Sequence, residues 1–220
     1  MDKKERVTPI YYSKKEDLLS ALIHGAGALF GIFSLIYMVT LSAQNGNAWS
    51  VVASAIYGAS LTILYTISTL SHALTHRGAR KVFRVLDHAT IFLLIAGTYT
   101  PVALIALQGA LGWTIFGIQW GIAAIGITLG AISLDRFKKI SSLIYLVMGW
   151  AIIIALYPLI RTIDPAGFFY LLGGGIFYSA GLLLYHLRMT FSHFFWHLFA
   201  LCGSVLQFIA VCRYILPMTY

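Results

Sequence analysis

Seven long apolar stretches, separated by short polar segments, run through this 220-residue chain. A hydrocarbon core of about 30 Å needs roughly 20 apolar residues in a helix, and each stretch meets that length. Charged residues are only 10% of the chain, whereas a soluble domain carries roughly 25%. We therefore predict an all-α integral membrane protein, a bundle of seven transmembrane helices. The expected spans are Leu18–Ser42, Ala48–Leu74, His88–Leu107, Gly112–Leu134, Ile140–Ile160, Ala166–Leu187 and His193–Leu216.

The basic residues between these spans predict the orientation. Of the 15 Lys and Arg residues, all but Arg161 and Arg213 lie on the side of the N-terminus. Cytoplasmic loops carry the excess of Lys and Arg, so we expect a cytoplasmic tail (residues 1–17), one transmembrane domain (18–216) and an external C-terminal end (217–220). The residues on the N-terminal side are Lys3, Lys4, Arg6, Lys14, Lys15, Arg77, Arg80, Lys81, Arg84, Arg136, Lys138, Lys139 and Arg188.

The positions of the charged residues and of the two cysteines exclude two classes of protein. The net charge of +8 is spread between apolar runs instead of forming one patch, so no nucleic-acid partner is expected. Cys202 and Cys212 both fall in the last apolar run and form neither a CxxC pair nor a disulfide framework. The chain is therefore expected to reside in a membrane, as a multi-pass protein, without disulfides.

Ionisable residues inside the expected spans gather on one side. His72 lies near the cytoplasmic end of the second span with Ser68 one turn deeper, and His193 opens the seventh span with His197 one turn deeper. Residues four apart share one face of a helix. Asp87 is expected at the start of the third span on the same side. Three neutral imidazoles beside a carboxylate predict a zinc site with one open position.

Each of these residues also has a simpler interpretation. A lone histidine near a helix end reaches lipid headgroups, which is the preferred interpretation of His76 and His186. Asp87 can act as a cap, because Asp favours a helix N-terminus. His24 lies deeper in the first span, on the same side. The constellation carries the zinc prediction, because ionisable groups inside spans are costly and usually functional.

Glycines spaced four apart predict close helix packing in the membrane, where small residues let backbones approach each other. The motifs are Gly27-x-x-x-Gly31, Gly117-x-x-x-Gly121 and Gly126-x-x-x-Gly130.

The polar residues lie in stretches that resemble a known family. Ser68-Thr-Leu-Ser-His72, Leu86-Asp87-His88-Ala-Thr-Ile-Phe-Leu-Leu-Ile-Ala-Gly-Thr-Tyr-Thr-Pro101 and His193-Phe-Phe-Trp-His197-Leu-Phe are similar to the hemolysin III family. That family is the bacterial branch of the progestin and adipoQ receptor (PAQR) superfamily. The resemblance implies a bacterial cytoplasmic membrane, zinc held by His72, His193 and His197, and Ser68 and Asp87 beside it, with the aspartate holding the zinc-bound water.

The resemblance has two departures. Entering the first span, the family often carries an acidic residue, then Asn, then Thr-His, whereas here Asp17 is followed by Ser20 and by Ile23 before His24. Gln207 stands where relatives often have His. We therefore assign no polar role to the start of the first span and do not place Gln207 on the metal.

Zinc on three histidines keeps a position for water, whose pKa it lowers toward ~7. We hypothesise that the site hydrolyses lipid amides, with Asp87 as the catalytic base and Ser68 as a hydrogen-bond partner of the water or the oxyanion. The resemblance to receptor and alkaline-ceramidase relatives implies the same activity. The expected partner is a membrane lipid or lipid-like ligand. The alternatives are a receptor-like or membrane-homeostasis protein with structural zinc and, ranked lower, a cytolytic protein. No His-Glu-x-x-His zincin motif is present, and the last span has no retinal-binding Lys.

Overall fold

Seven helices in the described part of the chain, residues 13–187 and 189–219 of a computed structural model, are long and apolar enough to cross a membrane. They confirm the predicted seven-helix class, and no strand occurs in these residues. The spans are Lys14–Asn45, Ala48–Ala73, Arg77–Leu107, Gly109–Lys138, Ile140–Thr162, Pro165–His186 and Ser192–Thr219.

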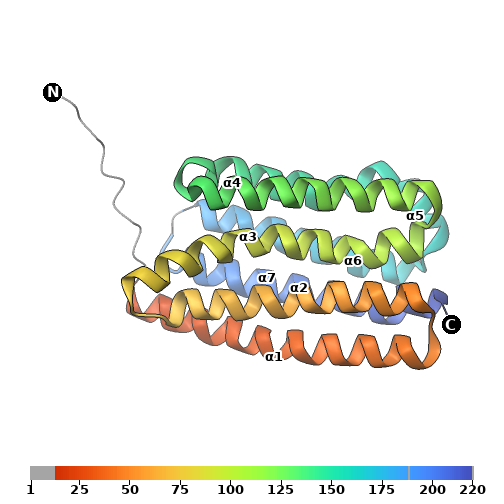
Figure 1. Cartoon of the computed structure of the whole chain (residues 1–220), viewed down its shortest axis with the longest axis horizontal. Coiled ribbons are helices and arrows are strands. Elements are labelled where there is room, and N and C mark those ends of the chain that lie inside the picture. The colour runs from red at the N-terminus through yellow and green to blue at the C-terminus, as the bar shows by residue number, and fades with distance from the viewer. Residues whose placement is uncertain (1–12, 188, 220) are drawn as a thin grey trace.

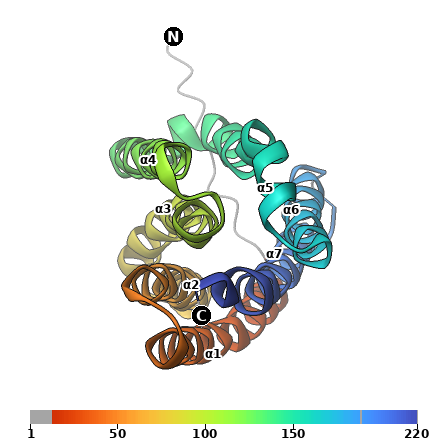
Figure 2. The ribbon, with the colours of Figure 1, turned by 90° about the vertical axis from the view of Figure 1, so that its right-hand side faces the viewer.

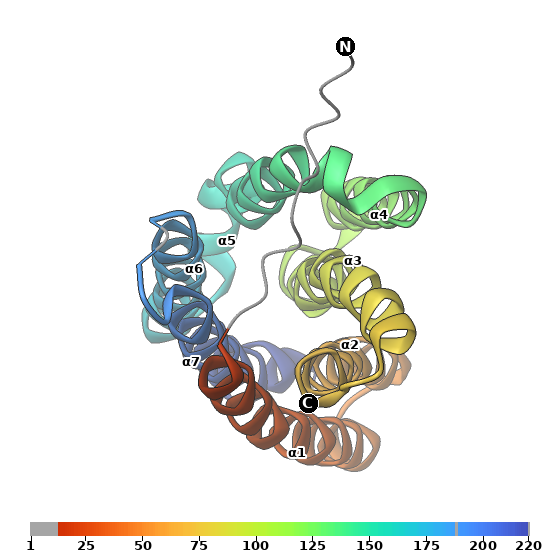
Figure 3. The same ribbon diagram turned by 90° about the vertical axis from the view of Figure 1, so that its left-hand side faces the viewer.

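The helices form a ring that encloses the interior when the bundle is viewed from either end (Figures 2 and 3). The fourth and fifth spans share one long element, α4, within which the chain reverses direction (Figure 1). Ser133 interrupts α4 with non-helical angles, φ −161° and ψ 95°. The elements are α1 (Lys14–Asn45), α2 (Ala48–Ala73), α3 (Arg77–Pro101), the π-helix η1 (Val102–Leu107), α4 (Gly109–Trp150), the 3-10 helix η2 (Ala151–Ala155), α5 (Leu156–Thr162), α6 (Pro165–His186), α7 (Ser192–Ala210), the π-helix η3 (Val211–Ile215) and the 3-10 helix η4 (Leu216–Thr219).

Local capping explains where several helices begin. The Ser13 hydroxyl accepts a hydrogen bond from the Glu16 N–H at the start of α1, 3.2 Å away. Asn47 and Ser50 form a reciprocal capping box at the start of α2. Asp164 caps α6, whose first residue is Pro165, and proline suits that position because it needs no N–H there. The short connections therefore end one helix and begin the next.

The start of the third helix differs from the prediction. α3 begins at Arg77, and the His76 ring nitrogen Nδ1 accepts a hydrogen bond from the Ala79 N–H at 3.3 Å. Asp87 and His88 consequently lie inside α3, so the expected place of Asp87 at the start of the helix and its alternative interpretation as a cap are wrong. The hydropathy pattern missed this segment because it is basic, although Ala, Arg and Lys favour helix.

Glycines pack closely at the α1–α2 interface, as predicted. Gly27 lies against the ring of Tyr65, and Gly31 lies against the backbone of Thr62. By contrast, a Cβ placed at Gly117 or Gly121 has no atom of the described residues within 4 Å beyond its chain neighbours and its own helix backbone. The packing prediction is therefore confirmed for the first motif and wrong for Gly117-x-x-x-Gly121.

α3 occupies the most buried place in the ring. In the most apolar 18-residue stretch of the third span, 67% of the residues are buried, compared with 17% in that of the sixth span. The orientation relative to the cytoplasm stays a prediction, which a reporter fused after Tyr220 tests: we expect external, not cytoplasmic, activity.

Candidate metal centre

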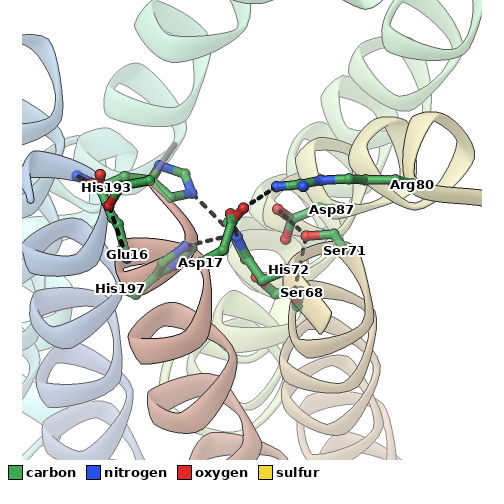
Figure 4. A network of polar contacts seen from close by, with 10 residues as sticks. Glu16, Asp17, Ser68, Ser71, His72, Arg80, Asp87, His193 and His197 are labelled. Carbon is green, nitrogen blue, oxygen red and sulfur yellow. Dashed lines mark hydrogen bonds and ion pairs between the residues drawn. The ribbon is translucent and has the colours of Figure 1, made fainter. Parts of the chain in front are cut away.

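Three histidine side chains from two helices meet at one end of the bundle. His72 comes from the last turn of α2, and His193 and His197 come from the first turns of α7. All three are buried, and their rings point toward one another (Figure 4). Both Nε2 atoms of the α7 histidines lie 3.1 Å from Nε2 of His72. The three residues each offer a ligand atom within 4.8 Å of the others, so they can hold a metal ion.

The spacing of these nitrogens fits a tetrahedral ion. Zn–N bonds of about 2.0–2.1 Å place two ligand nitrogens about 3.3 Å apart at the corners of a tetrahedron, close to the 3.1 Å observed. Three buried imidazole nitrogens this close are stabilised by sharing a cation, because imidazole is a good ligand for zinc and related metals. The three histidines that the sequence predicted to lie together therefore do so, and they could hold a metal ion.

Asp17, in the first turn of α1, contacts the metal-facing histidine of α2. Its Oδ1 lies 3.0 Å from Nδ1 of His72, and its Oδ2 accepts a hydrogen bond from the Arg80 guanidinium. In the tautomer whose Nδ1–H donates to this carboxylate oxygen, Nε2 of His72 keeps the lone pair that a metal needs. Asp17 therefore has a polar role, although the start of the first span departs from the family's pattern.

The neighbouring Glu16 contacts the other ligand helix. Its Oε1 accepts a hydrogen bond from the backbone N–H of His193 at 3.2 Å, although the two residues are far apart in the sequence. α7 begins after Phe191, which has a positive φ of 62° and gives no side-chain cap. Glu16 therefore supplies the side-chain acceptor that the N-cap residue Phe191 does not provide.

Asp87 and Ser68 lie near the histidine group on α3 and α2 (Figure 4). Asp87 Oδ2 accepts a hydrogen bond from the Ser71 hydroxyl at 3.3 Å. The Ser68 side chain is fully buried, and its Oγ has no hydrogen-bond partner among the described residues. The group that can hold a metal contains only the three histidines.

A cavity opens beside the histidine group between α3, α4, α6 and α7. Asp87, His88, His193 and His197 line it at the histidine end, and most of its remaining wall is apolar. Along α7 the lining continues from His193 to Gln207, which is roughly 21 Å of helix at 1.5 Å per residue. The cavity thus has a polar end and a long apolar body.

The contacts of His24 and Gln207, whose roles the sequence left open, are defined in the structure. His24 is buried, and its ring centroid lies 3.9 Å from that of His197. Gln207 Nε2 donates a hydrogen bond to the Leu171 carbonyl at 3.0 Å, which ties α7 to α6. Neither belongs to the metal-holding group. His186 is exposed, and its Nδ1 lies 2.8 Å from the Leu182 carbonyl. Cys202 and Cys212 are free thiols, as expected.

A bundle of seven membrane helices with a buried three-histidine group at one end defines a polytopic membrane protein with a candidate metal centre. Residues 12–208 match the family described as Haemolysin-III related. The chain is 44% identical to "Hemolysin-3" of Bacillus cereus over 214 residues, which are 97% of this chain and 98% of the relative. The chain therefore belongs to the haemolysin III family.

Two other relatives are similar in sequence to this chain, one at high and one at low identity. "Hemolysin-3 homolog" of Bacillus subtilis (strain 168) is 41% identical over 204 residues, covering 92% of this chain and 96% of the relative. The human "Monocyte to macrophage differentiation factor" is 24% identical over 206 residues, covering 87% and 84%. The distant human relative fits the predicted link to the PAQR superfamily.

Proposed function

We propose that this protein is a zinc-dependent hydrolase of lipid amides that works inside the membrane, with His72, His193 and His197 as the metal ligands. The observation that supports this most is the convergence of three buried Nε2 atoms, 3.1 Å apart along two edges, at the polar end of a largely apolar cavity. When bound on three imidazoles, zinc keeps an open position and supplies Lewis acidity.

The residues around the metal site have distinct proposed roles. Asp87 lines the cavity with His193 and His197, so its carboxylate accepts the proton of a water molecule that attacks the amide carbonyl. A bond forms between the water oxygen and the carbonyl carbon, the C–N bond breaks, and the proton goes to the departing nitrogen. The Ser68 hydroxyl, which is buried without a partner among the described residues, is available to hydrogen-bond the water or the developing oxyanion.

The shape and lining of the cavity support a lipid substrate. The histidine end offers polar side chains for an amide group, and residues such as Leu94, Trp196 and Ala200 line the apolar remainder. A long acyl chain buries apolar surface there, which is favourable. The proposed substrate is thus an amphiphile whose amide lies at the metal and whose chain follows α7.

Turnover of N-acyl lipids by purified protein, with zinc present, tests the proposed activity. Asp87→Asn should retain zinc but lower the rate by about 10²–10⁴-fold, the usual contribution of a general acid–base group. Asp135→Asn is the matched control, because Asp135 is exposed on the same face and pairs only loosely with Arg84, at 3.9 Å. Turnover that survives in Asp87→Asn would refute the role of Asp87.

A structural zinc site in a receptor-like or membrane-homeostasis protein is the second candidate. It is favoured by one observation: the histidines come from α2 and α7 and are held by α1 and α3 through Asp17 and Arg80, so a metal there would tie four helices together. Zinc-bound protein without turnover of any lipid amide would support this candidate. The two Bacillus relatives carry the name hemolysin, and a cytolytic activity ranks below both candidates.

A further inference from the structure

α1 contributes no metal ligand, yet the two acidic residues of its first turn contact both ligand-bearing helices. We infer that Glu16 and Asp17 are positioning residues that set the affinity of the site for its metal; this inference rests on the proposed zinc site. Asp17 fixes the ring of His72, and Glu16 fixes the start of the helix that carries His193. Because the two residues are adjacent, one helical turn holds both ligand helices in register.

Asp17 controls the orientation and tautomer of His72. The 3.0 Å contact between Oδ1 and Nδ1 directs the opposite nitrogen, Nε2, at the two α7 histidines. A carboxylate on the far nitrogen of a metal-bound histidine also raises the basicity of that ligand, and removing it typically weakens metal binding about 10–100-fold. Asp17 is thus placed to strengthen binding without touching the metal.

Arg80 holds the Asp17 carboxylate in place. Its guanidinium donates to Oδ2 of Asp17, and the Asp17 side chain is only 13% exposed. Oδ1 of the same carboxylate is thereby left directed at Nδ1 of His72. Arg80, in the first turn of α3, therefore acts on the metal site through Asp17.

Glu16 holds the first turn of α7. The first N–H groups of a helix have no partner within the helix, and Phe191 offers no side-chain cap there. The Glu16 carboxylate, itself buried, accepts one of these N–H groups, that of His193, at 3.2 Å. Without Glu16 this turn can fray, and His193 and His197 would no longer face His72 with fixed geometry.

The test measures zinc affinity by chelator competition, and the visible spectrum of bound Co²⁺, in the purified full-length protein. We expect Asp17→Asn to weaken zinc binding about 10–100-fold and to change the Co²⁺ spectrum. Glu16→Gln should cost less, because the amide oxygen can still accept from His193. Asp135→Asn, on an exposed carboxylate near Arg84, is the control and should leave both readouts unchanged.

Two comparisons separate positioning from general stabilisation. The metal-free melting temperatures of Asp17→Asn and Asp135→Asn should agree, so that only the zinc-dependent rise in stability is lost. Adding Arg80→Gln to Asp17→Asn should cause no further loss of affinity, because residues in one network are not additive. Arg80→Gln alone repeats the test if Asp17→Asn does not fold.

Wild-type zinc affinity and spectrum in Asp17→Asn and Glu16→Gln would overturn the inference while leaving the proposed zinc site intact. An affinity loss matched by an equal loss of metal-free stability would also overturn it, in favour of a purely structural role. A wild-type protein that binds no zinc would instead refute the proposed function on which the inference rests.

Discussion

The two sides of the ring are built differently. On one side α1 and α2 approach so closely that Gly31 lies against the backbone of Thr62, and α7 is joined to them by Glu16 and by the hydrogen bond between Tyr65 and Ser204. On the other side, in the fifth and sixth spans, only 22% and 17% of the residues of the most apolar stretch are buried. The three histidines that could hold a metal all come from the first side.

This difference separates two tasks. A metal site needs ligands fixed to fractions of an ångström, which close packing and hydrogen bonds provide. A cavity that admits a lipid needs a wall that can move. α6 lines the cavity and makes few contacts with α4, among them the hydrogen bond from Trp150 to Ser179. The packed side is therefore expected to govern metal binding, and the exposed side to govern access.

The largest effect is expected from removing a ligand on the packed side. His197→Ala leaves two imidazoles, and its zinc content should fall from about one ion per chain to near zero, since a site with three protein ligands loses one of them. Elemental analysis of purified protein measures this. Gln207→Ala, on the same helix but outside the metal group, should keep its zinc; full retention in His197→Ala would mean that the ligand set is wrong.

An intermediate effect is expected from adding one methyl group to the packed side and one to the fourth span, which lies outside it. A Cβ at Gly31 would lie 2.9 Å from the Thr62 backbone, which cannot yield as a side chain does, so Gly31→Ala should destabilise the fold by about 1–3 kcal/mol. Gly117→Ala meets no atom of the described residues within 4 Å beyond its chain neighbours and its own helix backbone and should be neutral or slightly stabilising, because alanine favours helix. Equal effects on unfolding would remove the contrast between the packed side and the fourth span.

The smallest effect is expected from the tie on the exposed side. Ser179→Ala removes the acceptor of the Trp150 Nε1–H, 2.9 Å away, and hydrogen bonds between membrane helices contribute about 0.6 kcal/mol on average. Stability should change by that amount, and zinc affinity should not change at all. A clear loss of zinc in this variant would show that both sides hold the metal.

The sequence predicted the seven spans because hydropathy reports directly on membrane crossing, and it predicted His72, His193 and His197 because the spacing of the α7 pair is helical and the orientation put all three on one side. It missed the true start of α3 because Arg77–Leu86 is basic yet helical. The hydropathy window measures apolarity and not helix formation.

Glu16 and Asp17 could not have been placed from the sequence, because their partners His193 and His72 are distant in the chain and meet them only through the packing of α1 against α2 and α7. The same limit applies to the glycine motifs: Gly27 and Gly117 have the same spacing, and only the position of each helix in the ring decides which one has a neighbour. An acidic pair in a first helical turn resembles ordinary capping, so the pattern alone indicated no ligand contact.

X-ray absorption at the zinc edge of the purified wild-type protein tests the central claim most directly, that three buried histidines hold one zinc with an open position. We predict three imidazole nitrogens and one further light atom at about 2.0–2.1 Å, with the scattering pattern of histidine rings. A sulfur shell at about 2.3 Å, which would place Cys202 or Cys212 on the metal, or a protein that retains no zinc, would contradict the account.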